Sequence, residues 1–188
     1  MASARARGVG GTAHDHIEHT FDVGRVVMCE ICEGMTPEEA HRRMLRTIDR
    51  FGWALQYVES SVDERGVHPA FCYTVGLTEI GCPEVIVTGR AADESVAVLG
   101  ELAHRLWHGD RLGPGERLEV GGLEVCLIRA REYESWLLRA VGLYGPAHVS
   151  AVQAVWADCQ GLMPWEAEIS STIVQPLLGP PPGGRMVA

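Results

Sequence analysis

The sharpest chemical motif in the sequence is a pair of cysteines, Cys29 and Cys32, separated by two residues. Two thiolates at this spacing can bind one zinc or iron ion, or they can form a redox-active pair. A redox pair works best when its first cysteine caps a helix, because the positive end of the helix dipole stabilises the thiolate. Here Thr36 is the predicted cap of the following helix, four residues beyond Cys32, which removes most of that stabilisation.

For a metal ion, the cysteine pair supplies half of a tetrahedral set of ligands. His41 is the predicted third ligand, because helical spacing places it on the same face as Met44 and Ile48. The sequence has no second Cys-x-x-Cys motif, and packed or incidental cysteines are the other interpretation. The fourth ligand stays open among Cys72, Cys82, His68 and His104.

A second group of candidates consists of polar side chains near the ends of predicted strands. They concentrate in two stretches, Tyr73–Glu79 and Asp158–Glu166, which we expect to be neighbours that line a pocket. Gly76 lies inside one of these strands, where a glycine often marks a bulge or the close approach of a ligand or another backbone. The other interpretation is that these residues only make turns and edge hydrogen bonds. The predicted pocket residues are His68, Tyr73, Thr74, Glu79, Gln153, Asp158, Trp165 and Glu166.

Arginines form a basic stripe on the first predicted helix. Glu38 and Glu39 lie four residues before Arg42 and Arg43, the favourable order for ion pairs on a helix. The pattern therefore predicts a solvated, ion-paired face rather than a contact for a polyanion. The stripe comprises Arg42, Arg43, Arg46 and Arg50.

Composition excludes several classes of function. All 16 basic residues are arginine and the chain contains neither lysine nor asparagine, which excludes lysine Schiff bases, a P-loop lysine and a Cys-His-Asn arrangement. The formal charge of −9 disfavours a general nucleic-acid binder, because phosphate contacts need a basic face. At 188 residues, 46% of them hydrophobic, the chain is long enough for one domain with a substantial core.

The helices are predicted from caps and periodicity. Thr36, Pro37 and Glu39 form a start signal with a capping box, and Gly52 ends the first helix. A second helix is expected over about 92–108 and a third over about 132–144. In the second helix, His104 and His108 are expected to face solvent.

Strands are expected over 53–58, 70–77, 84–88, 118–120, 123–128 and 151–156. Gly121 and Gly122 join two of them and predict a tight hairpin. The order of elements indicates an α+β fold in a single domain, with a mixed, mostly antiparallel sheet, about three helices and one Gly-Gly hairpin. We expect a flexible N-terminal extension over 1–27, the folded domain over 28–178 and a flexible Pro/Gly-rich tail over 179–188.

The sequence predicts a cytoplasmic protein. It has no apolar run of membrane-spanning length, and no hydrophobic segment follows the first arginines as it would in a signal peptide. Six cysteines in a chain of this length without an export signal are expected to be reduced thiols.

Several ordered motifs resemble those of a bacterial family, the domain of unknown function 4262. After the cysteine pair, His68-Pro69 leads into Tyr73-Thr74-Val75-Gly76-Leu77, and Pro83 to Gly89 follows. Tyr144-Gly145, Ala151-Val152-Gln153, Trp156-Ala157-Asp158 and Pro164-Trp165-Glu166 extend the resemblance over roughly residues 28–178. The resemblance implies no activity, cofactor or catalytic residue.

Two functional hypotheses follow from the residues. The leading one is an accessory module that binds a small molecule or a protein partner, because the acidic chain has no recognisable catalytic constellation. The alternative is a small metal- or thiol-dependent enzyme built around Cys29, Cys32 and His41. The sequence does not decide whether the protein is an enzyme.

Overall fold

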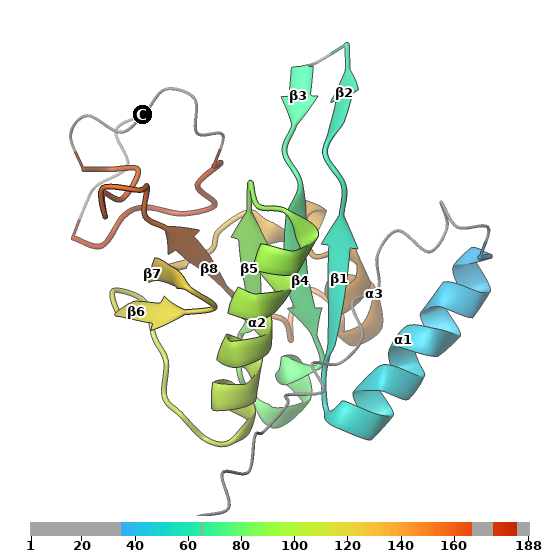
Figure 1. Cartoon of the computed structure of the whole chain (residues 1–188). Coiled ribbons are helices and arrows are strands. Elements are labelled where there is room, and N and C mark those ends of the chain that lie inside the picture. Colours follow the sequence, from blue (N-terminus) through green and yellow to red (C-terminus); the bar gives the residue numbers. More distant parts are fainter. Residues whose placement is uncertain (1–34, 65, 167–174, 184–188) are drawn as a thin grey trace, which may run out of the picture.

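The structure, a computed structural model, describes residues 35–64, 66–166 and 175–183. A six-stranded sheet with the order β1-β4-β5-β8-β7-β6 forms its centre, and a separate two-stranded sheet, β2-β3, extends beyond it (Figure 1). All neighbours in the large sheet are antiparallel except β5 and β8. The predicted α+β fold with a mixed, mostly antiparallel sheet is thus confirmed.

The strands of the large sheet are β1 (Ala54–Val58), β4 (Phe71–Val75), β5 (Glu84–Thr88), β6 (Arg117–Val120), β7 (Leu123–Arg129) and β8 (Ala151–Trp156). The small sheet consists of β2 (Ser61–Asp63) and β3 (Gly66–His68). The α-helices are α1 (Pro37–Phe51), α2 (Ala92–Trp107) and α3 (Leu138–Tyr144), and two 3₁₀ turns are η1 (Leu77–Ile80) and η2 (Tyr133–Ser135).

Helix α1 forms as its sequence predicts. The Thr36 hydroxyl accepts a hydrogen bond from the Glu39 N–H at 3.2 Å, and the Glu39 carboxylate accepts one from the Thr36 N–H at 2.9 Å. This reciprocal box satisfies two of the N–H groups that a helix start leaves without partners. Gly52 ends the helix with a left-handed φ of +85°.

The Gly-Gly hairpin between β6 and β7 is also confirmed. Gly121 and Gly122 both have positive φ, at +56° and +77°. Gly121 lies so close to α2 that a Cβ atom there would be 2.5 Å from the Val98 nitrogen. The turn therefore needs glycine both for its backbone conformation and for its contact with the helix.

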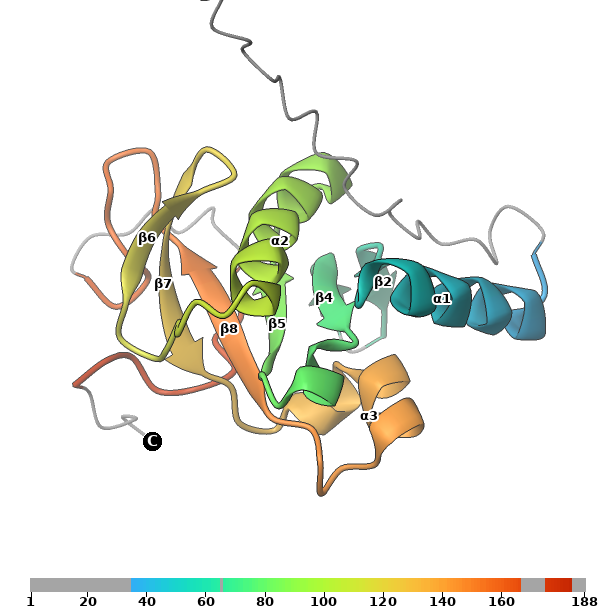
Figure 2. The same ribbon diagram turned by 90° about the horizontal axis from the view of Figure 1, so that it is seen from below.

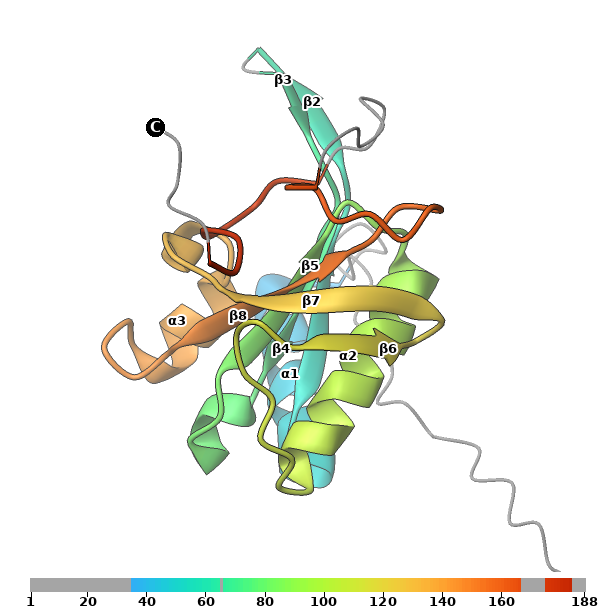
Figure 3. The same cartoon turned by 90° about the vertical axis from the view of Figure 1, so that its left-hand side faces the viewer.

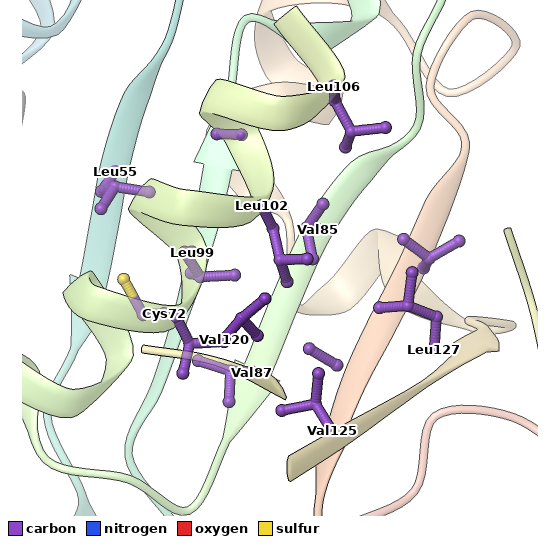
Figure 4. Packing of buried hydrophobic residues seen from close by; sticks show 14 of the residues in the cluster. Leu55, Cys72, Val85, Val87, Leu99, Leu102, Leu106, Val120, Val125 and Leu127 are labelled. Atoms are coloured by element: carbon purple, nitrogen blue, oxygen red, sulfur yellow. The ribbon is translucent and has the colours of Figure 1, made fainter. Parts of the chain in front are cut away.

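The large sheet carries a hydrophobic layer on each face. Helix α2 packs its leucines on one face, where Leu99, Leu102 and Leu106 meet the valines of β5 and the side chains of β7 (Figure 4). Helix α3 covers the opposite face, and α1 lies along the β1 edge and packs into the layer of α3 through Met44 and Ile48 (Figure 2). Each helix thus buries its apolar stripe against the sheet.

The segment predicted as one long third helix is broken. Glu132 has a positive φ of +48°, and Leu137 precedes α3 with a ψ of +45°, so η2 and α3 are separate. Side-chain contacts stabilise the break between η2 and α3. Trp136 packs edge-on against Phe71 with ring centroids 4.9 Å apart, and the Tyr133 hydroxyl donates to the Val149 carbonyl at 2.7 Å. Tertiary contacts therefore override the helical propensity of the segment.

None of the helices in the described part of the chain has the length and the apolar run that a bilayer crossing requires. The predicted N-terminal extension, residues 1–27, lies outside the described residues. Both predicted domain boundaries, at 27/28 and at 178/179, stay predictions.

Candidate functional site

The structure does not bring the two predicted pocket stretches together. Strand β4 runs antiparallel to β5, whereas β8 runs parallel to it, so β4 ends where β8 begins. Glu79 follows β4 at one end of the sheet, and the stretch 158–166 follows β8 at the other end (Figure 1). The expectation that the stretches are neighbours is wrong. Whether the single residues bind a ligand stays a prediction.

In the second stretch, the predicted pocket residues make local contacts. The Asp158 carboxylate accepts hydrogen bonds from the N–H groups of Gln160 and Leu162 at 2.8 and 2.9 Å, which closes a turn. The Glu166 carboxylate accepts from the Met163 N–H at 2.8 Å and pairs with the Arg117 guanidinium. Trp165 packs against a small apolar cluster that includes Met163. These side chains therefore hold their own loop against β6 and β7.

Gln153 anchors the C-terminal segment, residues 175–183, to the sheet. Its side-chain amide is fully buried in β8. The NH₂ group donates to the Thr88 hydroxyl at 3.0 Å and to the Pro176 carbonyl at 2.7 Å, and the amide oxygen accepts from the Leu178 N–H at 2.7 Å. Buried polar groups need such partners, so Gln153 is engaged within the fold.

The most concentrated polar cluster among the described residues surrounds Glu84, which the sequence analysis placed in a strand and not among the site residues. Its carboxylate is fully buried at the start of β5. One oxygen, Oε1, accepts from the N–H groups of Gly76 and Thr78, each at 3.0 Å, and from the Thr78 hydroxyl at 2.8 Å. The other, Oε2, accepts from the Thr74 hydroxyl at 2.6 Å. We call these four residues, Thr74, Gly76, Thr78 and Glu84, the Glu84 cluster.

The Glu84 cluster replaces part of the β-ladder. The paired register of β4 and β5 ends at Tyr73 and Ile86. Beyond it, the Thr74 hydroxyl accepts from the Val85 N–H at 2.8 Å while it donates to Glu84. The carboxylate thus fastens η1 to the end of the sheet, where backbone pairing stops. This arrangement stabilises the fold and leaves the carboxylate with no exposed surface for a ligand.

Burial sets the pH dependence of the Glu84 cluster. Desolvation raises the pKa of Glu84 above its usual value of 4.5, and the four donors oppose this only in part. Above pH 4.5 and up to the raised pKa, the native state holds a proton that the unfolded chain has released. The free energy of unfolding should therefore fall as the pH rises through this window.

We expect this decrease in the free energy of unfolding in the wild type and not in Glu84→Gln, because glutamine does not titrate. Urea unfolding of both proteins from about pH 4 to 8 measures it, because the other carboxyl groups cancel in the difference between them. A wild-type-minus-variant difference that stays flat or increases with pH would contradict the assignment.

Tyr73 and Glu79, at the α3 side of the sheet, also have internal partners. The Tyr73 hydroxyl accepts a hydrogen bond from the backbone N–H of Arg139 at 3.2 Å, and burial raises the pKa of Tyr73 to about 12. The Glu79 carboxylate accepts from the Tyr144 hydroxyl at 2.9 Å. Burial, this hydrogen bond and the nearby carboxylates raise the pKa of Tyr144. Both tyrosines therefore stay protonated over the ordinary pH range.

The predicted metal site cannot be assembled from the described residues. Cys29 and Cys32 lie outside them, and His41 is half-buried on α1. Within the described ranges, no group of three or more His, Cys, Asp or Glu side chains is arranged to hold a metal ion. Cys72 is buried, and burial raises the pKa of its thiol to about 12. A role for Cys29, Cys32 and His41 with zinc or iron stays a prediction.

Two open grooves are present on the described surface. One, of about 460 Å³, lies along the β6–β7 hairpin and includes Arg117, Glu119 and Glu124. The other, of about 320 Å³, lies between the start of β5 and the end of α2 and includes Cys82 and Leu106. Neither groove contains a predicted pocket residue.

Val62, the most exposed large apolar side chain among the described residues, lies on the β2–β3 hairpin, which we call the arm (residues 61–64 and 66–68). Val62 and Val67 face each other directly across the hairpin and are 77% and 66% exposed. On the other face, the carboxylate of Asp63 lies 3.0 Å from the ring of His68. All three residues of β2 are exposed, and the arm projects beyond the large sheet (Figure 3). His68 is the predicted pocket residue that belongs to this arm.

The sequence contained a weak signal for the arm. Ser61-Val62-Asp63 and Gly66-Val67-His68 each alternate polar and apolar residues around a short turn, which is the pattern of a hairpin with one apolar face. Each segment is only three residues long, so the pattern is too short to identify by itself.

Comparison with protein families shows to which family the chain belongs. A family model described as a domain of unknown function (DUF4262) matches residues 47–170, which is more than half of the chain. The chain belongs to the DUF4262 family. The DUF4262 match includes the arm, the Glu84 cluster and β8. No match was found among the curated proteins or among the solved structures.

Proposed function

We propose that this DUF4262 domain is an accessory protein-binding module of the bacterial cytoplasm, and that the arm is the element that contacts its partner. The observation that carries the proposal is the pair of exposed valines, Val62 and Val67, directly opposite each other on a hairpin that projects from the body. Single exposed apolar residues are ordinary, whereas a paired apolar face on a projecting ribbon is a feature of contact surfaces.

The valines make little contribution to the stability of the domain. A valine stabilises a fold through the surface that it removes from water, and these two leave most of their surface exposed. Full burial of a valine contributes about 1.5 kcal/mol, so a partner that covers both gains up to about 3 kcal/mol. A cross-strand pair of β-branched residues also presents a stiff surface, which loses little side-chain entropy on binding.

The polar residues support a protein partner rather than a small molecule. Gln153, Asp158 and Glu166 were expected to face a ligand, yet each is engaged by hydrogen bonds within the fold. The arm projects from the body (Figure 3), and its residues line neither of the two grooves, whereas small-molecule sites are concave.

A photo-crosslinking amino acid placed at position 62 tests the proposal. Its matched control is the same amino acid at position 138, because Leu138 is 67% exposed on α3, away from the arm. Both full-length proteins are irradiated as purified protein and in extract of the host cell. We expect discrete crosslinked species from position 62 that position 138 does not give. Equal or weaker crosslinking from position 62 would overturn the proposal.

A further inference from the structure

Helix α1 presents an outward face that is basic and partly apolar. Arg42, Arg46 and Arg50 are exposed at intervals of one turn, opposite the buried Ala40, Met44 and Ile48. Leu45 lies beside them and is 37% exposed. Glu38 and Asp49 are exposed on the same side of the helix, so this face carries three guanidinium groups, two carboxylates and an apolar side chain. It is net positive in a chain whose formal charge is −9.

Three arginines of this face, Arg42, Arg46 and Arg50, form no ion pair with the described residues. Arg42 donates to the backbone carbonyl of Glu38 at 3.3 Å, and the Glu39 carboxylate is bound in the capping box. Arg50 lies over the Phe51 ring, 4.9 Å from its centroid. In the described part of the chain, no carboxylate lies at ion-pair distance from these two arginines or from Arg46. Three cations are therefore available to an acidic surface.

The arm has the complementary chemistry. The Asp63 carboxylate pairs with His68 on the face opposite the valines. Glu59 and Glu64 are exposed at the base of the arm and directly after β2, and they supply the negative charge of the arm. Its valine pair matches the apolar Leu45 and the aliphatic stems of the arginines. The acidic, apolar arm and the basic, apolar face of α1 are therefore complementary in both charge and hydrophobicity.

We propose that the partner of the arm is a second copy of this chain, and that the arm of each copy docks on the outward face of α1 of the other. This inference rests on the proposed function, since it names the partner of the same surface. A two-fold axis makes the contact reciprocal, so each dimer contains it twice. At physiological salt, charges interact over about 8 Å, so the repulsion between two acidic chains is screened while the contacts at the interface persist.

Charge exchange between two variants tests the proposal. Arg46→Glu makes the α1 face less basic, and Glu64→Arg makes the arm less acidic. Each homodimer then brings two like charges together at both contacts. In the mixed dimer, one contact keeps the original pair and the other has it reversed, so both are favourable. Sedimentation velocity of the full-length chains measures the association.

We expect the wild type to dimerise and each variant alone to dimerise with a dissociation constant at least about tenfold higher. The equimolar mixture should recover the wild-type affinity. Matched controls are Arg111→Glu and Glu119→Arg, which change the net charge equally at exposed positions away from the arm and α1. Both controls should dimerise as the wild type does.

The other outcomes separate this inference from the proposed function. A wild type that stays monomeric while position 62 crosslinks to another protein in extract would overturn the second-copy partner only. A wild type that stays monomeric without such a crosslink would overturn both. Dimers that form equally well with either variant, or that are not restored in the mixture, would overturn the contact between the arm and α1.

Discussion

Replacement of Glu84 by alanine is expected to lower the free energy of unfolding by about 3–5 kcal/mol. The carboxylate accepts four hydrogen bonds at the end of the sheet, two of them from the backbone N–H groups of Gly76 and Thr78. Alanine leaves these donors without an acceptor and opens a cavity around them. Urea unfolding near neutral pH measures the change.

Glu84→Gln is the matched control, because glutamine keeps the shape and one oxygen. With the amide oxygen in the place of Oε1, three of the four hydrogen bonds remain, and only the bond with the Thr74 hydroxyl is disturbed. We expect a loss of about 1 kcal/mol. A Glu84→Ala protein as stable as Glu84→Gln would show that the cluster does not hold η1 to the sheet.

Replacement of Gly76 by alanine should destabilise the domain by at least about 3 kcal/mol, because backbone strain at a positive φ and steric overlap of the new Cβ atom add together. Gly76 has a φ of +129°, a conformation that side chains rarely adopt. A Cβ atom there would lie 2.6 Å from the Gly52 carbonyl oxygen and 2.8 Å from the Trp53 Cα. Both neighbours are backbone atoms, so β1 and β4 would have to separate.

Gly81→Ala separates the two causes. Gly81 also has a positive φ, +74°, but a Cβ atom there would have nothing within 4 Å. Its substitution should therefore cost only the backbone strain, about 1–2 kcal/mol. Thermal and urea unfolding of both variants measure the difference. Equal losses for Gly76→Ala and Gly81→Ala would mean that the close approach of the two backbones does not constrain the fold.

Local signals in the sequence were enough for most of the fold. The capping box at Thr36 and the glycine stop at Gly52 defined α1, and Gly121-Gly122 defined the hairpin, because each depends on contacts between residues close in the chain. For Gly76 the sequence left open a bulge or the close approach of a ligand or another backbone, and the structure shows the approach of another backbone. The third helix was wrong over residues 132–137, where tertiary packing of Trp136 and Tyr133 decides the conformation.

The candidate site was less predictable, because it depends on the order of strands. Strand β8 is the last in the chain, yet it lies between β5 and β7 and runs parallel to β5. No local sequence pattern indicates that β8 inserts between β5 and β7. This insertion is the reason that Glu79 and Asp158 lie at opposite ends of the sheet. The arm escaped prediction for a different reason, since two strands of three residues give too little periodicity.

The proposal that Val62 and Val67 bind a partner is tested most directly by the crosslinking yield from position 62 in a Val67→Arg background. Arginine at this exposed position changes the free energy of unfolding by no more than about 0.5 kcal/mol, which urea unfolding verifies in the same protein. We predict that the crosslinks from position 62 fall at least about tenfold, since a guanidinium group at position 67 would be buried in the contact and would face the arginines of α1. Crosslinking that continues at the wild-type yield in the folded variant would contradict a docking role for the arm.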